Sequence, residues 1–370
     1  MNYKKDTMKR FALFIIALAL ISLACGESAE IAPDPKLAPV KITDAQPKGE
    51  RILAIDVTDP ADGDYDAALS TAIDAGAEAL SLSLFWDDLE RAPRQYEPNP
   101  NFLEIANAYY PTRNIAVDLV INPIDTNQAL LPEDLQNLPF DDPAIISRFK
   151  NLLDYIFTQI PALNLVSLSI GNEIDGYLGT DAQKWAEYTA FYAATSAHAR
   201  TLRPDLVVGT KGMYDGVIGD SVAYFQEINE YSDAIFVTYY PLNGDFTVRD
   251  PSTVHDDFAK VIAAYPDKEI YFLELGYPSS EKCDSSEAKQ AEFIAETFKA
   301  WDTHTDQIKT INFAWLNEIP PSSVSELENY YGFANKGFAA YLGSLGFLNK
   351  DGSEKAAYGQ LREEAKARGW

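Results

Sequence analysis

The sequence contains little cysteine, histidine and methionine. Among its 370 residues are two cysteines, three histidines and three methionines. The three histidines, His198, His255 and His304, lie far apart along the chain. This spacing argues against a histidine-based zinc site and against a Ser-His-Asp triad. Aspartates are dense between Asp56 and Asp66, but their spacing does not match an EF-hand calcium loop. We therefore expect no metal site and no cofactor.

Positive charge is also scarce. The chain has 30 lysines and arginines against 56 aspartates and glutamates, which gives a formal net charge of −26. A surface this acidic repels nucleic acid and anionic polysaccharides, so both classes are excluded as ligands. Neutral ligands remain compatible with the charge.

Long apolar runs are absent from the sequence except near its start. Phe11–Leu23 is apolar, follows four basic residues between Lys4 and Arg10, and is too short to span a bilayer comfortably. This pattern is typical of an export signal. The run closes on Ala24-Cys25-Gly26, which resembles a bacterial lipoprotein signal. The resemblance implies lipidation at Cys25, and a plain secretory peptide cleaved nearby is the alternative.

Three segments follow from this pattern. Residues 1–25 form a lipoprotein-type signal peptide, residues 26–49 form a proline-containing tether, and residues 50–370 form one domain. We expect an exported protein, held by a lipid anchor at Cys25 on a bacterial membrane and facing the periplasm or cell surface, or otherwise secreted. Cys283 is the one other cysteine, so an acylated Cys25 leaves no intrachain disulfide.

From residue 52 onward, β-rich apolar runs alternate with helical stretches, which indicates parallel βα units. The expected strands are Ile52–Val57, Ala79–Phe85, Ile115–Asn122, Leu165–Gly171, Leu206–Thr210, Ala234–Tyr239, Ile270–Leu275 and Lys309–Trp315. The expected helices cover residues 65–76, 101–110, 142–160, 181–202, 219–230, 252–265, 285–303 and 336–345, with Asp142-Pro143 and Thr180 as helix starts. Eight units predict an α/β fold, a single (β/α)8 TIM barrel.

An open, doubly wound sheet is the competing fold. That fold binds phosphates through a glycine-rich turn after its first strand. Here the corresponding turn, Asp56–Asp62, is acidic and almost free of glycine. The barrel is therefore favoured.

Two glutamates lie at the ends of expected strands. Glu173 follows the fourth strand, in Gly171-Asn172-Glu173, and Glu274 lies just inside the end of the seventh, in Phe272-Leu273-Glu274-Leu275. Packing does not explain them, because burying an unpaired charge is costly. In a barrel these strand ends face the active site, and two carboxylates there are what glycosidic bond hydrolysis requires. A salt bridge across the barrel mouth is the alternative.

The sequence around both glutamates resembles clan A of the glycoside hydrolases, a superfamily of retaining β-glycosidases on (β/α)8 barrels. The segment Glu274–Ser279 resembles the nucleophile region of β-1,3-glucanases, and its Tyr-Pro pair that of endo-β-1,4-galactanases. Trp86–Glu90 resembles a segment of clan β-galactosidases, and Gly346–Gly352 the ending of many members. The resemblance covers about residues 50–365 and implies that Glu173 is the acid/base and Glu274 the nucleophile.

Further residues are candidates for contact with a neutral poly- or oligosaccharide. Asn172 is placed to bind the sugar 2-hydroxyl. Tyr239 or Tyr240 could orient Glu274 or simply pack. Trp315 resembles the sugar platform of the clan, with a place in the core as the alternative. Trp86 could line the same cleft or belong to the core.

Two departures from the clan pattern leave a second function open. Many members carry an arginine near the end of the second strand and a histidine near the sixth, and the segments 82–86 and 236–240 have neither. The alternative is a non-catalytic glycan-binding surface lipoprotein on a glycosidase-like barrel. The sugar, the linkage, internal or terminal cleavage and the oligomeric state have no readable signature.

Overall fold

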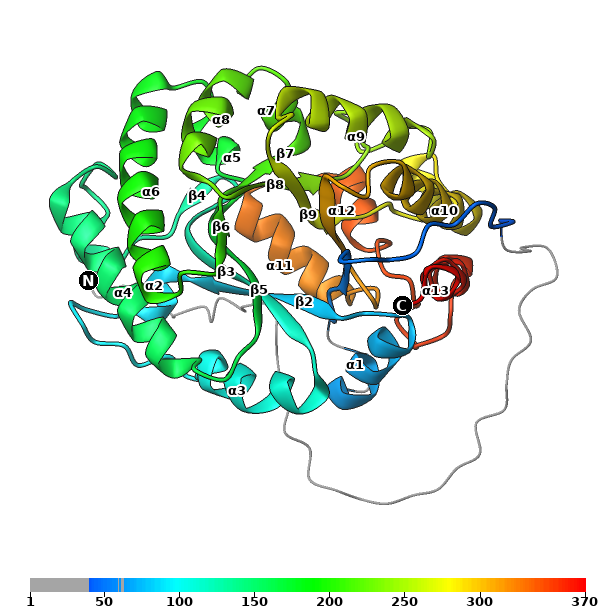
Figure 1. Cartoon of the computed structure of the whole chain (residues 1–370), viewed down its shortest axis with the longest axis horizontal. Helices are drawn as coiled ribbons and strands as arrows, with labels where there is room; N and C mark the ends of the chain where they lie inside the picture. Colours follow the sequence, from blue (N-terminus) through cyan, green and yellow to red (C-terminus); the bar gives the residue numbers. More distant parts are fainter. Residues whose placement is uncertain (1–39, 59, 61–62) are drawn as a thin grey trace, which may run out of the picture.

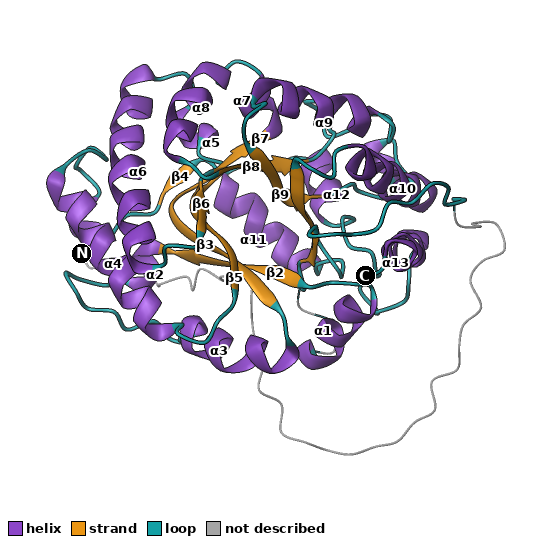
Figure 2. Ribbon diagram, viewed as in Figure 1, coloured by secondary structure: helices purple, strands orange, loops and turns teal. Residues whose placement is uncertain are grey.

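The computed structural model describes residues 40–58, 60 and 63–370 and confirms the (β/α)8 barrel (Figures 1 and 2). Parallel strands follow the order β6-β5-β3-β2-β1-β10-β9-β8-β7. Their bounds are β1 (Ile52–Ile55), β2 (Ala79–Phe85), β3 (Ala116–Asp125), β5 (Leu165–Asn172), β6 (Val207–Gly209), β7 (Lys211–Met213), β8 (Ala234–Tyr239), β9 (Glu269–Leu275) and β10 (Ile308–Phe313). The short strand β4 (Gln128–Ala129) pairs with the end of β3.

The fifth strand of the barrel is divided at Thr210. Its first half, β6, pairs with β5, and its second half, β7, pairs with β8. The sequence predicted one strand ending at Thr210, and the structure continues it through Lys211–Met213. The extension brings the buried side chain of Lys211 into the barrel wall beneath the mouth.

Helices surround the strands (Figure 2). Eight agree with the expected segments to within a few residues: α1 (Tyr65–Asp74), α3 (Phe102–Tyr109), α4 (Pro143–Gln159), α6 (Ala182–Leu202), α8 (Val222–Ile228), α9 (Thr253–Ala264), α10 (Glu287–Thr303) and α12 (Lys336–Leu342). Asp142 caps α4 before Pro143, as predicted, whereas the cap of α6 is Asp181 and not Thr180. Shorter helical turns are α2 (Trp86–Leu89), η1 (Tyr110–Arg113), η2 (Glu133–Leu135), α5 (Asp175–Leu178), α7 (Tyr214–Ile218), η3 (Asn229–Tyr231) and η4 (Glu281–Cys283).

Two helices of more than ten residues were not expected from the sequence. Helix α13 (Ala356–Arg368) packs beside α10, and helix α11 (Pro321–Tyr331) lies within the ring of strands in the view of Figures 1 and 2. Val324 and Leu327 of α11 pack in an apolar cluster with Phe338 of α12. An 11-residue helix is about 16 Å long, which is enough to extend across the mouth. Helix α11 therefore covers the C-terminal end of the barrel.

The barrel interior holds charged and polar side chains where branched aliphatic residues are usual. Buried Asp118 accepts hydrogen bonds from the hydroxyl of Ser81, at 3.1 Å, and from that of Ser167. Buried Asp56 accepts one from Nδ2 of Asn312 at 2.9 Å. Burial raises the pKa of Asp56 to about 7 and also raises the pKa of Asp118. Protonation of such carboxyls reduces the cost of keeping them out of water.

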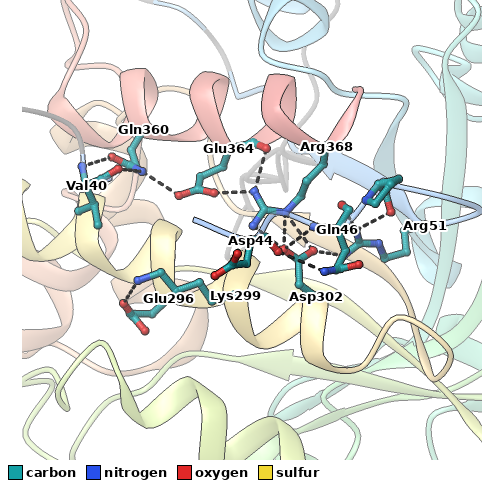
Figure 3. Close-up of polar contacts among 11 residues, drawn as sticks. Val40, Asp44, Gln46, Arg51, Glu296, Lys299, Asp302, Gln360, Glu364 and Arg368 are labelled. Carbon is teal, nitrogen blue, oxygen red and sulfur yellow. Dashed lines mark hydrogen bonds and ion pairs between the residues drawn. The ribbon is translucent and has the colours of Figure 1, made fainter. Parts of the chain in front are cut away.

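A polar cluster joins the beginning and end of the described chain (Figure 3). The carboxylate of Asp302, in α10, contacts Arg51 at 2.9 Å and Arg368 at 2.7 Å. Arg368 also pairs with Glu364 at 2.5 Å. Both guanidinium groups are almost fully buried, so the shared carboxylate compensates two desolvated positive charges. The cluster fixes the segment before β1 against α10 and α13.

The expected signal peptide, its lipidation site Cys25 and the tether up to residue 39 lie outside the described residues. Residues 40–49, expected as the end of the tether, run along the barrel, where the backbone N–H of Val40 donates to Oε1 of Gln360 at 2.7 Å. In the part of the chain that the structure describes, no helix is both long and apolar enough to cross a membrane. Cys283 is a buried free thiol.

Candidate active site

A strained turn after β5 directs Glu173 into the barrel mouth. Gly171 has φ +90°, and a Cβ at this position would lie 2.4 Å from the hydroxyl oxygen of Tyr188. Glycine is therefore required there. Glu173 itself has φ +46°, in the left-handed region that other residues seldom adopt. This conformation is strained, so contacts with surrounding residues must stabilise it. Strained residues of this kind are common at functional sites.

Two threonine hydroxyls hold the carboxyl group of Glu173. The hydroxyl of Thr126, just after β3, donates to Oε2 at 2.8 Å, and that of Thr238, on β8, donates to Oε1 at 2.7 Å. Burial, with a smaller contribution from the negative charge of Glu274, raises the pKa of Glu173 to about 8, although both hydroxyls act in the opposite direction. Glu173 is therefore a proton donor at neutral pH.

Thr238 also connects the two glutamates. It is the register partner of Glu274 across the β8–β9 pair, and its hydroxyl binds Glu173 from β5. The charge of Glu274 acts on Glu173 as the second cause of its raised pKa. Both carboxyl groups therefore share one site at the C-terminal ends of the strands, as the sequence predicted.

The two oxygens of Glu274 face different partners. The phenol of Tyr240, which follows β8, donates to Oε1 at 2.5 Å. The ammonium group of Lys211, from β7, lies 3.9 Å from Oε2. About a quarter of the Glu274 side chain is exposed (26%), so the carboxylate remains accessible from the mouth.

Asn172 and Asp125 form a second polar group beside Glu173. Nδ2 of Asn172 donates to Oδ1 of Asp125 at 2.8 Å, and the phenol of Tyr330, from α11, donates to Oδ2 at 2.8 Å. Burial raises the pKa of Asp125. Oδ1 of Asn172 is buried and has no hydrogen-bond partner among the described residues. A buried acceptor of this kind is suited to a ligand hydroxyl.

Helix α11 covers this site. Asn127, beside β4, donates to the carbonyl of Tyr331 at 2.9 Å, and Gln128 donates to that of Tyr330. The ring of Tyr330 stacks on Phe85 at the end of β2, with centroids 6.1 Å apart. Burial raises the pKa of Tyr331, and the charges of the site carboxylates add to this effect. The two tyrosines that end α11 therefore form part of the site wall.

Two of the predicted aromatic residues lie at the mouth. Tyr240 binds Glu274 and packs edge-on against Tyr341 of α12, with ring centroids 5.3 Å apart. Trp315, which follows β10, is half-buried against the same apolar cluster as α11 and α12. Its position is compatible with a sugar platform.

The other two predicted aromatic residues, Tyr239 and Trp86, belong to the core. Their predicted contact with substrate is therefore wrong, and the packing alternative holds for both. Tyr239 is fully buried and donates to Asp257 at 2.9 Å, because alternation along β8 turns it away from the interior that Tyr240 faces. Trp86 is also fully buried, packs on Phe149 and donates to Glu90 at 2.9 Å. Neither has surface left for a sugar.

Several site residues were not predicted from the sequence: Asp125, Thr126, Lys211, Thr238, Tyr330 and Tyr331. Four of them lie at or just after the end of β3 or α11, whereas Lys211 begins β7 and Thr238 lies within β8. None stands in a readable motif. Among the described residues, no group of three or more histidine, cysteine, aspartate or glutamate side chains could hold a metal ion.

No protein-family model and no curated protein matches this sequence. Solved structures share its barrel. The exo-β-1,4-mannosidase Op5Man5 from Opitutaceae bacterium strain TAV5 has a TM-score of 0.66 at 17% identity, over 86% of this chain and 59% of that chain. A GH5_18 protein from Streptomyces cattleya, in complex with GlcNAc, has a TM-score of 0.67 at 16% identity, over 88% and 81%. A family 39 glycoside hydrolase from Bacteroides cellulosilyticus WH2 has a TM-score of 0.60 at 14% identity, over 86% and 64%.

The chain spans less than two thirds of the mannosidase and of the family 39 enzyme. At these identities the likeness shows the fold. The barrel is the one on which these glycoside hydrolases are built, in agreement with the clan A resemblance of the sequence, and the exact family is left open.

Proposed function

We propose that this protein is a glycoside hydrolase that cleaves β-glycosidic bonds in a neutral glycan with retention of configuration. The observation that carries the proposal is a pair of glutamates in unlike surroundings, joined through Thr238. Glu173 has a pKa raised to about 8, whereas Glu274 faces an ammonium group and a phenol. Such a pair supplies a protonated acid and an ionised nucleophile. The glycoside hydrolases that share the barrel support this class.

The reaction has two steps. The carboxylate of Glu274 attacks the anomeric carbon while Glu173 gives its proton to the departing glycosidic oxygen, which leaves a glycosyl ester on Glu274. Glu173, now ionised, then takes a proton from a water molecule whose oxygen attacks the same carbon and releases Glu274. Two inversions restore the starting configuration. Enzymes of this type hold their carboxyl groups about 5–5.5 Å apart.

Recognition of the sugar is assigned to Asn172 and Trp315. Oδ1 of Asn172 is buried without a protein partner among the described residues, so it can accept a hydrogen bond from the 2-hydroxyl of the sugar. Nδ2 is held by Asp125, which fixes the orientation of the amide. Trp315 offers an aromatic face at the mouth. The net charge of −26 favours an uncharged substrate.

A β-mannoside is the first substrate to test. One similar structure is an exo-β-1,4-mannosidase, and GH5_18 variants from Bifidobacterium longum and Streptomyces cattleya were solved with Manβ1-4GlcNAc. We propose a β-1,4-linked mannosyl group as the favoured substrate, ahead of glucosyl and galactosyl groups.

The test is sugar release from Manβ1-4GlcNAc and from aryl β-mannoside, β-glucoside and β-galactoside. Wild type is compared with Glu173→Gln, Glu274→Gln and the surface control Glu227→Gln, with circular dichroism as a check of folding. From the disaccharide and from aryl glycosides whose leaving group needs a proton, we expect release by wild type and the control only. Glu173→Gln should still open a dinitrophenyl glycoside, because that leaving group needs no proton. A 2-fluoro sugar should label Glu274, and early product should have the β configuration.

Full activity of folded Glu274→Gln would refute the assignment of the nucleophile. Binding of glycans by a folded wild type that releases no sugar would favour the glycan-binding lipoprotein instead.

We also propose that the protein is exported and anchored through a lipid on Cys25. The support is the sequence alone, with its basic and apolar start followed by Ala24-Cys25-Gly26. The native protein should partition into detergent, and Cys25→Ser should partition into water. If both proteins partitioned into water, the lipid anchor would be refuted and the alternative of a secreted protein would be favoured.

A further inference from the structure

Lys211 is a buried cation in the wall of the barrel. It is the first residue of β7, directly after the break at Thr210, and its side chain is 4% exposed. A buried ammonium group is costly unless carboxylates compensate it. The mechanism proposed above assigns it no step, so its position requires a separate explanation.

Carboxyl groups from three other strands surround this cation. Its charge lowers the pKa of Asp56, which follows β1, and of Asp118 and Asp125 from β3, and in each case burial has the larger, opposite effect. Asp56 and Asp118 have their own hydrogen-bond donors on neighbouring strands. The ion pair formed by Lys211, at 3.9 Å, is with Glu274.

The two oxygens of Glu274 have partners of different kinds. Tyr240 donates to Oε1, and Lys211 lies near Oε2. The phenol supplies direction without charge, whereas the ammonium supplies positive charge. The ammonium group therefore attracts the carboxylate that the phenol orients.

We propose that Lys211 is a positioning residue that keeps Glu274 ionised and directed at the substrate. This inference rests on the proposed function of Glu274 as nucleophile. The titratable groups that act on Glu274 or are acted on by it are Lys211, Glu173, Asp56, Asp125, Tyr240, Tyr331 and Tyr341. Lys211 is the cation of this set, so its removal changes the charge balance at the nucleophile.

A purely structural role is the competing explanation. Lys211 could be present only to neutralise Asp118 and Asp56 in the interior. The variant Lys211→Met/Asp118→Asn separates the two roles, because it removes the ammonium group together with a buried carboxyl group on which its charge acts. That variant leaves no carboxyl at position 118 to be neutralised and leaves Glu274 without its cation.

The experiment measures kcat/KM against pH for wild type, Lys211→Met, Lys211→Arg, Lys211→Met/Asp118→Asn and the control Lys309→Met. Lys309 forms a partly exposed ion pair with Glu269 at the opposite end of the barrel. We expect the acid limb of Lys211→Met to move up by about one pH unit or more. The limb should remain displaced in the double variant and return in Lys211→Arg. The proposal would be overturned if the acid limb of folded Lys211→Met stayed at its wild-type pH. It would also be overturned if the acid limb of the double variant returned to the wild-type pH.

A double-mutant cycle between Lys211→Met and Glu274→Gln gives a second readout that needs no activity. Urea unfolding should show coupling between the two substitutions at pH 7 and loss of coupling in acid, where Glu274 is protonated. Absence of coupling at pH 7 would refute the ion pair even if the protein proved not to hydrolyse glycosides. An inactive wild type that shows coupling would contradict the proposed function and retain the ion pair.

Discussion

The phenol oxygen of Tyr240 lies 2.5 Å from Oε1 of Glu274. Tyr240 immediately follows β8, the strand beside the one that carries Glu274, so the contact is set by the sheet. A charge-assisted hydrogen bond of this length fixes the direction of the carboxylate. Of the two neighbouring tyrosines, Tyr240 is therefore the one that orients Glu274, whereas Tyr239 binds Asp257.

Replacement of Tyr240 by phenylalanine should lower kcat. A hydrogen bond to a charged group contributes about 1.5–3 kcal/mol, which corresponds to a loss of roughly 10- to 100-fold. Steady-state kinetics on an aryl β-mannoside would measure it. Tyr239→Phe is the matched control: it should lower stability through Asp257 and leave kcat of the folded enzyme near that of wild type. Equal kcat losses in both variants would contradict the assignment.

The alkaline limb of the activity profile should report Glu173. Its pKa is raised to about 8, so the acid keeps its proton below that pH, and activity should fall as the pH rises through it. Thr238→Val removes a donor that favours the ionised form and should therefore move the limb to higher pH. Profiles of kcat/KM for both proteins test the sign. A shift to lower pH would show that Thr238 supports the protonated form instead.

Tyr330 should affect substrate binding more than chemistry. Tyr330→Phe removes the hydrogen bond to Asp125 but keeps the stack on Phe85. One hydrogen bond is worth about 1 kcal/mol, so we expect KM to rise roughly fivefold with little change in kcat. The exposed Tyr231 provides the control as Tyr231→Phe. A loss confined to kcat would instead place the Tyr330 hydroxyl in the reaction itself.

Asp302 should be important for stability. Asp302→Ala leaves the buried guanidinium groups of Arg51 and Arg368 without their shared carboxylate. Removal of one partner from a buried ion pair costs about 3–5 kcal/mol, measurable by urea unfolding. The nearby exposed Asp306→Ala should change stability by less than about 0.5 kcal/mol. A similar small change for Asp302→Ala would mean that water compensates both arginines.

The barrel and its two glutamates could be predicted from the sequence because they depend on local patterns. Alternating apolar runs give the strands, and strand order alone brings Glu173 and Glu274 to one end. The division at Thr210 was missed because Lys211-Gly212-Met213 has no β-rich character. Its strand conformation depends on pairing with β8.

Helix α11 was missed for a similar reason. It begins at a Pro-Pro pair and is polar on most of its surface, although Val324, Leu327 and Tyr331 have helical spacing and could have indicated it. The hydrogen-bond partners of Glu173 could not be predicted from the sequence. Thr126 and Thr238 come from different strands and are ordinary residues whose role appears only when the barrel closes.

The Asp302 cluster also holds the first and last segments of the domain close together, which affects where the chain could begin and end. The backbone N–H of Lys48 donates to the carbonyl of Arg368 at 2.8 Å, so the first and last segments of the domain are neighbours. Neighbouring ends allow circular permutation. A short linker from Trp370 back to Gln46, with new ends opened in an outer loop, would keep every strand pair and the mouth intact. The eight βα units form a closed cycle, and the natural starting point is one of several that the architecture permits.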